Sequence, residues 1–120
     1  MKADPYVKNA VVNSLENNKM RIIDAYKYFT SKIKNAETVE EIMAFKTLLL
    51  SSLVAKLPLG PFSCYFCIAH DGDCLKCEYG RVHGVCDADD DSDYAKICKA
   101  RTELLMALES YYRGETYDGE

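Results

Sequence analysis

The sequence predicts an all-α protein: a three- or four-helix bundle with an inserted cysteine-rich metal-binding loop. Apolar residues recur at steps of three and four along most of the chain, the period of a helix with one buried face. Five of the six cysteines and both histidines fall within one segment that lacks this period. At 120 residues the chain has the size of one domain. We expect a single domain over residues 1–120, with helices at about 4–34, 38–57 and 91–113 and the loop at 58–90.

The first predicted helix opens at Asp4-Pro5, where aspartate suits the N-cap and proline the first helical position. Asn17-Asn18 is a weak point at which we expect a kink or a short break. The apolar stripe on either side of it is interpreted as core, and its members are Tyr6, Ala10, Val11, Leu15, Ile22, Ile23, Tyr26, Phe29 and Ile33.

The second predicted helix opens at Thr38, and Glu41 three residues later completes a capping box. Its apolar residues extend around most of the circumference, which predicts that it is central in the fold or covered by a second subunit. Pro58 is expected to end it.

The last predicted helix carries a continuous apolar stripe. Cys98 falls inside this stripe and is interpreted as a small core residue rather than a metal ligand. The other members are Tyr94, Ile97, Leu104, Leu105, Leu108, Tyr111 and Tyr112. Gly114 is expected to end the helix.

The cysteine segment contains two C-x-x-C pairs and one further cysteine, and these residues are the predicted metal ligands: Cys64, Cys67, Cys74, Cys77 and Cys86. A C-x-x-C pair presents two thiolates to one ion from a single tight turn, and two such elements complete the tetrahedral shell of structural zinc. Five cysteines are one more than the site needs. Cys64 and Cys67 form the first half, Cys86 is the natural distal ligand, and Cys77 is slightly preferred to Cys74. All four C-x-x-C cysteines together, or His70 or His83 in place of one thiolate, are the alternatives.

Zinc is the expected ion, because the cysteine spacing matches none of the usual runs that bind iron–sulfur clusters. An iron–sulfur cluster is the alternative, since it also takes thiolate ligands. The N-terminus lacks a secretory signal, so we expect a reducing, cytoplasmic location in which thiols are metal ligands more often than disulfides. Residues 58–87 hold few apolar side chains, and structural zinc can supply on the order of 10 kcal/mol to order them. A loop held by its metal ligands is the preferred description of this segment, and a tiny β-hairpin, with short strands at Tyr65-Phe66 and Arg81-Val82, is the alternative.

The order of two C-x-x-C pairs, one cysteine and then an aromatic residue that opens a helix resembles short cysteine-cluster proteins of unknown function from phages, archaeal viruses and prophages. The resemblance covers Cys64 to Tyr94. It implies a small accessory protein of a virus or mobile element and no enzymatic activity.

Charge is distributed unevenly along the chain. Residues 1–57 carry nine Lys and Arg against six Asp and Glu, a net charge of +3, whereas residues 58–120 carry six against thirteen, a net charge of −7. The acidic half disfavours binding of duplex nucleic acid through the cysteine segment.

Three functions remain open, and a protein-interaction module stabilised by a structural metal and able to form a homo-oligomer is preferred. A nucleic-acid-binding regulator is the first alternative, with contacts from Lys8, Lys19, Arg21, Lys27, Lys32 and Lys34. A thiol-redox or iron–sulfur protein is the second. The sequence contains no Ser-His-Asp set, HExxH, P-loop or GxGxxG motif, so we expect no enzyme, and its apolar runs are too short to expect a membrane partner.

Overall fold

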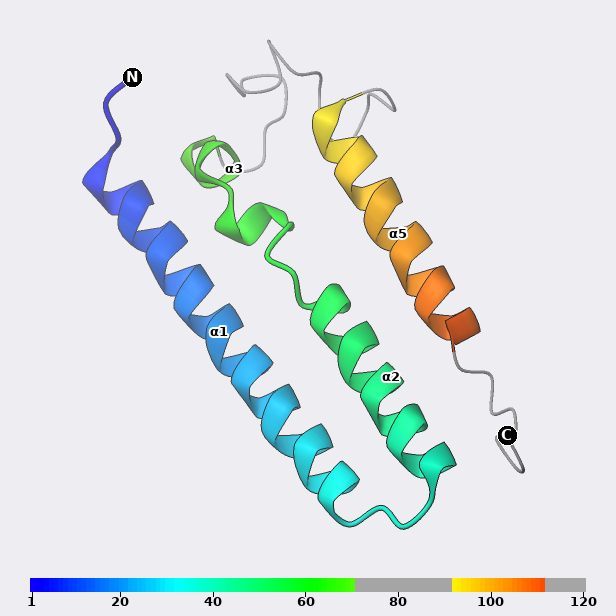
Figure 1. Cartoon of the computed structure of the whole chain (residues 1–120). Coiled ribbons are helices and arrows are strands. Elements are labelled where there is room, and N and C mark those ends of the chain that lie inside the picture. Colours follow the sequence, from blue (N-terminus) through cyan, green and yellow to red (C-terminus); the bar gives the residue numbers. More distant parts are fainter. Residues whose placement is uncertain (71–91, 112–120) are drawn as a thin grey trace. The chain divides into compact units, whose positions relative to one another are not determined.

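The computed structural model of the chain describes residues 1–70 and 92–111, and all regular structure within these ranges is helical (Figure 1). The elements are α1 (Pro5–Lys34), α2 (Val39–Ala55), the 3-10 helix η1 (Pro61–Ser63), α3 (Tyr65–Ala69) and α5 (Asp93–Tyr111). The predicted helical class is confirmed, while the three- or four-helix bundle with an inserted cysteine-rich metal-binding loop stays a prediction. Neither α1, the longest of these helices, nor any other helix in the described ranges combines the length and apolarity needed to cross a bilayer.

Helix α1 begins as its sequence predicts. The Asp4 carboxylate accepts a hydrogen bond from the Tyr6 backbone N–H at 2.8 Å, and Pro5 occupies the first helical position, where no N–H is required. The helix then runs for 30 residues through Asn17-Asn18, so the short break considered there is absent. Its last turn carries Lys32 and Lys34, where positive charge interacts favourably with the helix dipole.

Helix α2 has the predicted capping box. The Thr38 hydroxyl accepts a hydrogen bond from the Glu41 backbone N–H at 3.1 Å and donates to the Glu41 carboxylate at 3.0 Å. The same carboxylate accepts from the Glu37 N–H at 3.4 Å, so the side chain of Glu41 reaches back across the helix start. The helix ends at Ala55, with Lys56 as C-cap, two residues before the predicted last helical residue, Leu57.

Ser92 immediately precedes helix α5, and its hydroxyl accepts a hydrogen bond from the Ala95 N–H at 3.0 Å. Ser92 is only 1% exposed, which makes this cap the most buried side chain of the described residues. Asp93 lies in the first turn, where a negative charge is favourable. The predicted helix at 91–113 is therefore present over Asp93–Tyr111.

The first part of the predicted loop is helical rather than extended. This part forms η1 and α3, and Tyr65-Phe66, the alternative strand, are the first two residues of α3. The strand alternative is wrong here, and so is an irregular loop over these residues, because a strand needs a partner, whereas a short helix satisfies its hydrogen bonds within the segment. The other predicted strand, Arg81-Val82, lies outside the described residues.

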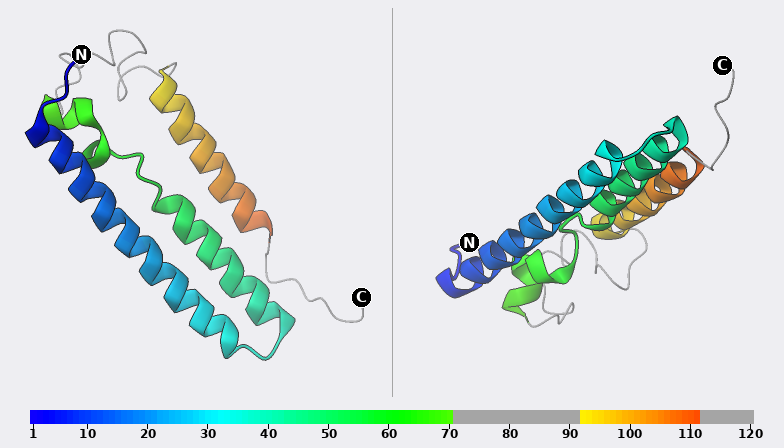
Figure 2. Two further views of the ribbon diagram at one scale, coloured as in Figure 1. Left: turned by 60° about the vertical axis from the view of Figure 1, so that its left-hand side comes forward. Right: turned by 90° about the horizontal axis from the view of Figure 1, so that it is seen from below.

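Two compact units divide the chain, and both α1 and α5 contribute to each of them. One comprises Met1–Asn18 and Pro58–Ala100, and the other comprises Lys19–Leu57 and Arg101–Glu120. Within the second unit, the last part of α1 and α2 run side by side in opposite directions, joined by a short turn (Figures 1 and 2). The single domain predicted over residues 1–120 stays a prediction.

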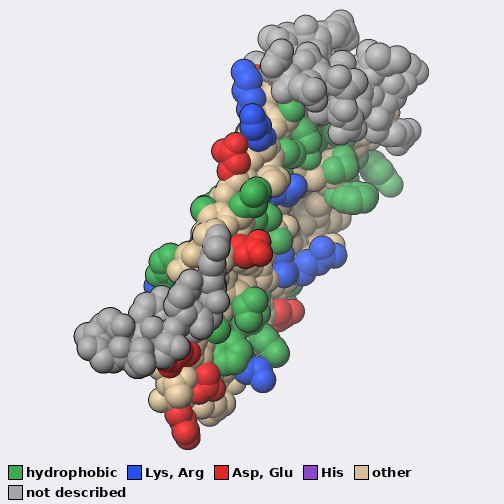
Figure 3. Space-filling view, turned by 90° about the vertical axis from the view of Figure 1, so that its right-hand side faces the viewer, with side chains coloured by type: hydrophobic (Ala, Val, Ile, Leu, Met, Phe, Trp, Pro, Cys, Tyr) green, Lys and Arg blue, Asp and Glu red, His purple; other side chains and the backbone are tan. Residues whose placement is uncertain are grey.

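The described helices bury little apolar surface. Ala25, at 8% exposed, is the one buried hydrophobic residue among them. Thr47 is also buried, and its hydroxyl donates to the Met43 carbonyl at 2.8 Å, so its polar group is satisfied within α2. Figure 3 shows hydrophobic side chains at the surface in several groups among charged ones. Most apolar side chains of the described residues are therefore half-buried or exposed.

Candidate functional site

The first C-x-x-C pair lies at the start of α3. Cys64 is the N-cap of this helix and Cys67 lies within it, three residues later. The backbone of Cys64 is extended (φ −94°, ψ 121°), so one thiol leaves the chain just before the helix and the other from its first turn. Both side chains are half-buried, and Cys64 carries a free thiol. Two thiolates so placed match half of a tetrahedral zinc site.

A turn upstream of α3 holds Cys64 in place. Pro61 starts η1, and the Ser63 hydroxyl donates to the carbonyls of Pro58 at 2.9 Å and Gly60 at 3.3 Å. The Cys64 N–H donates to the Pro61 carbonyl at 3.3 Å. These bonds fold the Leu57–Pro61 turn back on itself, so the chain enters α3 in one defined direction.

Tyr65 ties α3 to the start of the chain. Its hydroxyl oxygen accepts a hydrogen bond from the backbone N–H of Asp4 at 2.7 Å, across 61 positions of sequence. Its ring also makes an edge-to-face contact with Phe66, with centroids 5.9 Å apart and an interplanar angle of 84°. This contact was not anticipated from the sequence, because no local pattern links a tyrosine hydroxyl to a distant N-cap.

His70 ends α3 as its C-cap, and its backbone N–H donates to the Phe66 carbonyl at 3.1 Å. The side chain is half-buried. Although His70 follows Cys67 by three residues, the described part of the chain contains no group of three His, Cys, Asp or Glu residues placed to hold a metal ion. His70 therefore does not join Cys64 and Cys67 in a ready three-ligand site. The other predicted ligands, Cys74, Cys77 and Cys86, and the alternative ligand His83 lie outside the described residues.

Cys98 lies on α5 and is half-buried. The sequence interpretation placed it in an apolar stripe, and the half-buried positions of α5 follow that stripe through Tyr94, Cys98, Leu105 and Leu108. Ile97, Leu104 and Tyr111 are exposed instead, so the shielded side of α5 is narrower than predicted.

Apolar side chains are exposed along α2. Val39 is 57% exposed and Ile42 is 40% exposed on one side of the helix, while Leu48, at 52%, is exposed on another. Buried Thr47 marks the shielded side. The predicted apolar circumference of this helix is therefore present, and the described part of the chain leaves much of it open.

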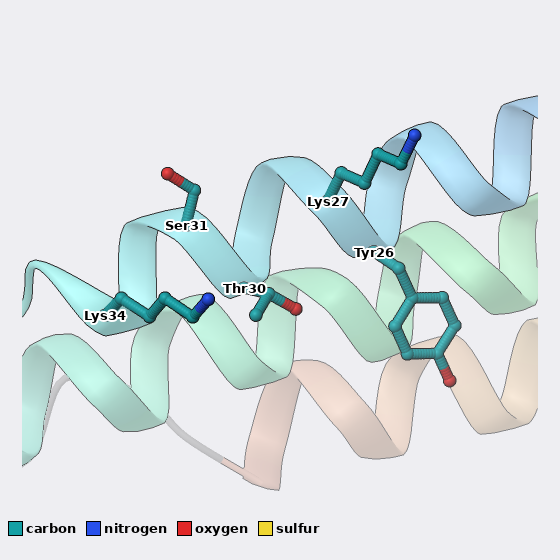
Figure 4. A pocket seen from close by; sticks show the side chains of 5 residues that line it. All are labelled: Tyr26, Lys27, Thr30, Ser31 and Lys34. Atoms are coloured by element: carbon teal, nitrogen blue, oxygen red, sulfur yellow. The ribbon is translucent and has the colours of Figure 1, made fainter.

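A shallow hollow of about 350 Å³ lies on the last part of α1 (Figure 4). Its lining residues all come from this one helix: Tyr26, Lys27, Thr30, Ser31 and Lys34. Figure 4 shows Lys34 extending along the helix towards Thr30, whereas Tyr26 and Lys27 point in different directions. Two ammonium groups and three hydroxyls suit an anion. Because every lining residue belongs to a single exposed helix, the hollow offers little enclosure.

Lys32, a third lysine in the last part of α1, contacts an aromatic ring rather than the hollow. The Lys32 ammonium lies 5.4 Å from the centre of the Tyr28 ring, one helical turn away, in a cation–π arrangement. Lys27 and Lys34 are seven residues apart and share one face of α1, whereas Lys32 projects from another. Of the three lysines near the hollow, two therefore share its face and one does not.

Comparison with protein-family models, with curated proteins and with solved structures found no match for this chain, and the resemblance to phage and viral cysteine-cluster proteins stays a prediction.

Proposed function

We propose that the protein is a small protein-interaction module that associates with a second copy of itself and whose cysteine segment is ordered by one structural zinc ion. The observation that carries the proposed self-association is the exposed apolar surface of α2. In addition, Ala25 is the only buried hydrophobic residue in the described ranges. Full burial of one Leu, Ile or Val side chain stabilises a protein by about 1.5–3 kcal/mol. A second subunit would recover that energy for residues such as Val39 and Ile42.

Light scattering coupled to size exclusion tests self-association directly. Two chains of 13.6 kDa give 27.2 kDa, and we expect this mass, or a higher multiple, at micromolar concentration. A mass of 13.6 kDa at every concentration up to the millimolar range would overturn the proposal.

The zinc part of the proposal is supported by the placement of the first cysteine pair. Cys64 and Cys67 offer two soft thiolate donors at the start of α3, and both side chains are half-buried. Two further donors would come from Cys74, Cys77 and Cys86, or from His70 or His83. When bound, zinc would cross-link these segments and supply no redox chemistry.

Elemental analysis with an absorbance spectrum tests the ion. We expect one zinc per chain and a spectrum without visible bands. Iron with absorbance in the visible would indicate the cluster alternative. A metal-free protein whose cysteines fail to react with a thiol reagent under denaturing conditions would indicate disulfides and overturn the zinc proposal.

Nucleic-acid binding is a second candidate function, favoured by one observation: Lys27 and Lys34 line the same hollow with three hydroxyl groups. Phosphate contacts dominate such binding and weaken steeply with salt. A double Lys27→Ala, Lys34→Ala variant should then bind a fluorescent RNA or DNA oligonucleotide more weakly at low salt. Wild-type protein that shifts no oligonucleotide at 50 mM salt or below removes this candidate.

A further inference from the structure

The hollow on α1 is lined by polar side chains that have no partner in the described part of the chain. These residues are Tyr26, Lys27, Thr30, Ser31 and Lys34. None of their side chains makes a hydrogen bond, an ion pair or a ring contact with another described residue. Each ammonium group offers three donors and each hydroxyl offers one. These donors are therefore available to a ligand that carries negative charge.

The hollow lies on the side of α1 opposite its shielded side. Successive helical residues turn by about 100°, so Lys27 is about 160° and Lys34 about 180° from Ala25. Ala25 is the buried residue of α1, whereas all five lining residues are exposed. The element that shields Ala25 therefore leaves the hollow open to a ligand from solvent.

The stretch of α1 that carries the hollow is basic. Residues 19–34 hold five Lys and Arg and one Asp, a net charge of +4 in a chain whose formal net charge is −4. The acidic residue, Asp24, is about 60° around the helix from Lys27 and makes no ion pair with it. A basic surface attracts polyanions, and phosphate contacts dominate the affinity of proteins for nucleic acids. Charge complementarity therefore favours a chain of phosphates as the occupant.

Tyr26 adds an aromatic ring at one edge of the hollow. Figure 4 shows this ring projecting from the helix on a different side from the Lys27 ammonium group. The Tyr26 side chain is 50% exposed. Tyr28 differs, because its ring packs edge-to-face on Phe29 at 5.0 Å between centroids and also lies under the Lys32 ammonium. Of these two tyrosines, Tyr26 is therefore the one whose ring no described residue occupies.

We propose that the hollow binds a single-stranded nucleic acid, with phosphates held by Lys27 and Lys34 and one base stacked on the ring of Tyr26. This inference rests on the second candidate function and adds the form of the strand and the residue that contacts a base. Proteins that bind single strands combine basic residues along the backbone with aromatic rings on which bases stack. In a duplex the bases are already paired and stacked on each other, so they present no face to Tyr26.

The proposed site is short. Lys27 and Lys34 are seven residues apart, so their Cα atoms lie about 10 Å apart along α1. A stacked strand rises about 3.4 Å per nucleotide, so the two lysines span about three nucleotides. Thr30 and Ser31 lie between them in sequence and offer hydroxyl donors to the intervening phosphate. We therefore expect binding that weakens with salt and depends little on base identity.

Fluorescence anisotropy of the full chain with a labelled oligothymidine of about a dozen nucleotides tests the form of the strand. At low salt, the single strand should bind at least about fivefold more tightly than the same strand annealed to its complement. A duplex that binds as tightly as the single strand would overturn the inference and leave nucleic-acid binding standing. Wild-type protein that binds neither would overturn both.

Tyrosine variants of α1 test the stacking contact. Tyr26→Leu should weaken binding of the single strand by about tenfold, whereas Tyr26→Phe, which keeps the ring, should stay within about twofold of the wild type. Tyr28→Leu is the matched control and should also stay within about twofold. Both tyrosines are exposed, so neither leucine variant removes a core side chain. Equal losses from the two leucine variants, or no loss from Tyr26→Leu, would overturn the stacking contact.

Heparin, a polyanion without bases, separates stacking from charge. Tyr26→Leu should bind heparin as the wild type does, and an equal loss on heparin and oligothymidine would contradict stacking. The Lys27→Ala, Lys34→Ala double variant should lower the slope of log K against log salt for oligothymidine by about 1.4, because each phosphate contact on a single strand contributes about 0.7. Lys32→Ala should leave this slope nearly unchanged. A double variant with the wild-type slope would overturn the proposed phosphate contacts.

Discussion

Helices α2 and α3 each follow an N-cap residue with extended backbone, but the two helices are stabilised in different ways. α2 opens on Thr38, whose hydroxyl caps the Glu41 N–H, and continues for 17 residues. α3 opens on Cys64, which makes no side-chain capping hydrogen bond, and ends after five residues. The N-cap of one helix is a hydrogen-bond acceptor for its own backbone, whereas the N-cap of the other is a candidate metal ligand.

The difference shows what each helix needs from outside. Isolated helices shorter than about 12–15 residues are marginal in water because helix nucleation is costly. α2 exceeds that length, and its cap and apolar residues are encoded locally. α3 depends on the η1 turn before it and on the Tyr65–Asp4 hydrogen bond, and we propose that it also depends on metal. We therefore expect α3 to be the first described helix to melt when its external supports are removed.

Metal removal should produce the largest difference in stability between α2 and α3. Structural zinc can contribute on the order of 10 kcal/mol, so chelation, or the Cys64→Ser, Cys67→Ser double variant, should leave α3 unfolded. Hydrogen exchange of the Ile68 and His70 amides, which donate within α3, reports this loss. The amides of α2 should retain most of their protection.

The matched control for the cysteine variant is Cys98→Ser, which alters a cysteine predicted to be core rather than a ligand. It should leave zinc content at one per chain. Protection of Ile68 and His70 that persists after complete chelation would mean that α3 is stable without metal, and the contrast with α2 would then have a different cause.

Removal of the α2 cap should have an intermediate effect. Thr38→Ala removes the acceptor for the Glu41 N–H and should lower the free energy of unfolding, measured by urea denaturation, by about 1 kcal/mol. Thr30→Ala is the control, since Thr30 is exposed near the C-terminal end of α1, where alanine is the better helix former. That control should be neutral or slightly stabilising, and equal losses from both variants would show that the cap contributes nothing specific.

The Tyr65 hydroxyl should have the smallest effect of the three. Tyr65→Phe removes the acceptor for the Asp4 N–H, which is exposed and can bond to water instead, so the loss should be below about 1 kcal/mol. Tyr6→Phe, which alters a side chain that is 85% exposed, should change the unfolding free energy by a few tenths at most. A decrease in the free energy of unfolding well above 1 kcal/mol for Tyr65→Phe would contradict this prediction, because a single exposed hydrogen bond does not account for so large an effect.

The long helices were predictable because their signals are local. Asp4-Pro5, the Thr38 capping box and the three-and-four spacing each act within a few residues, and all three are present in the structure. The start of the cysteine segment was less predictable. Tyr65-Phe66 are compatible with a strand by composition, but the turn closed by Ser63 and the hydrogen bond from Asp4 favour a helix there.

The candidate site divides in the same way. The spacing of Cys64 and Cys67 predicted two thiols at one tight turn, and the structure places one at the N-cap of α3 and the other in its first turn. The remaining ligands depend on contacts between segments far apart in the chain, which spacing does not specify. Their identity stays a prediction.

By itself, the sequence determined the helical class, the helix caps and the closeness of Cys64 and Cys67 along the chain. Each of these follows from residues at most four positions apart. Only the tertiary structure decided which residues are shielded: polar Thr47 is buried in the middle of α2, whereas the equally central and more hydrophobic Leu48 is exposed. The physical reason is that periodicity defines the faces of a helix, but burial depends on which face a neighbouring element covers. For α2 we propose that a second copy of the chain covers one of the faces left open.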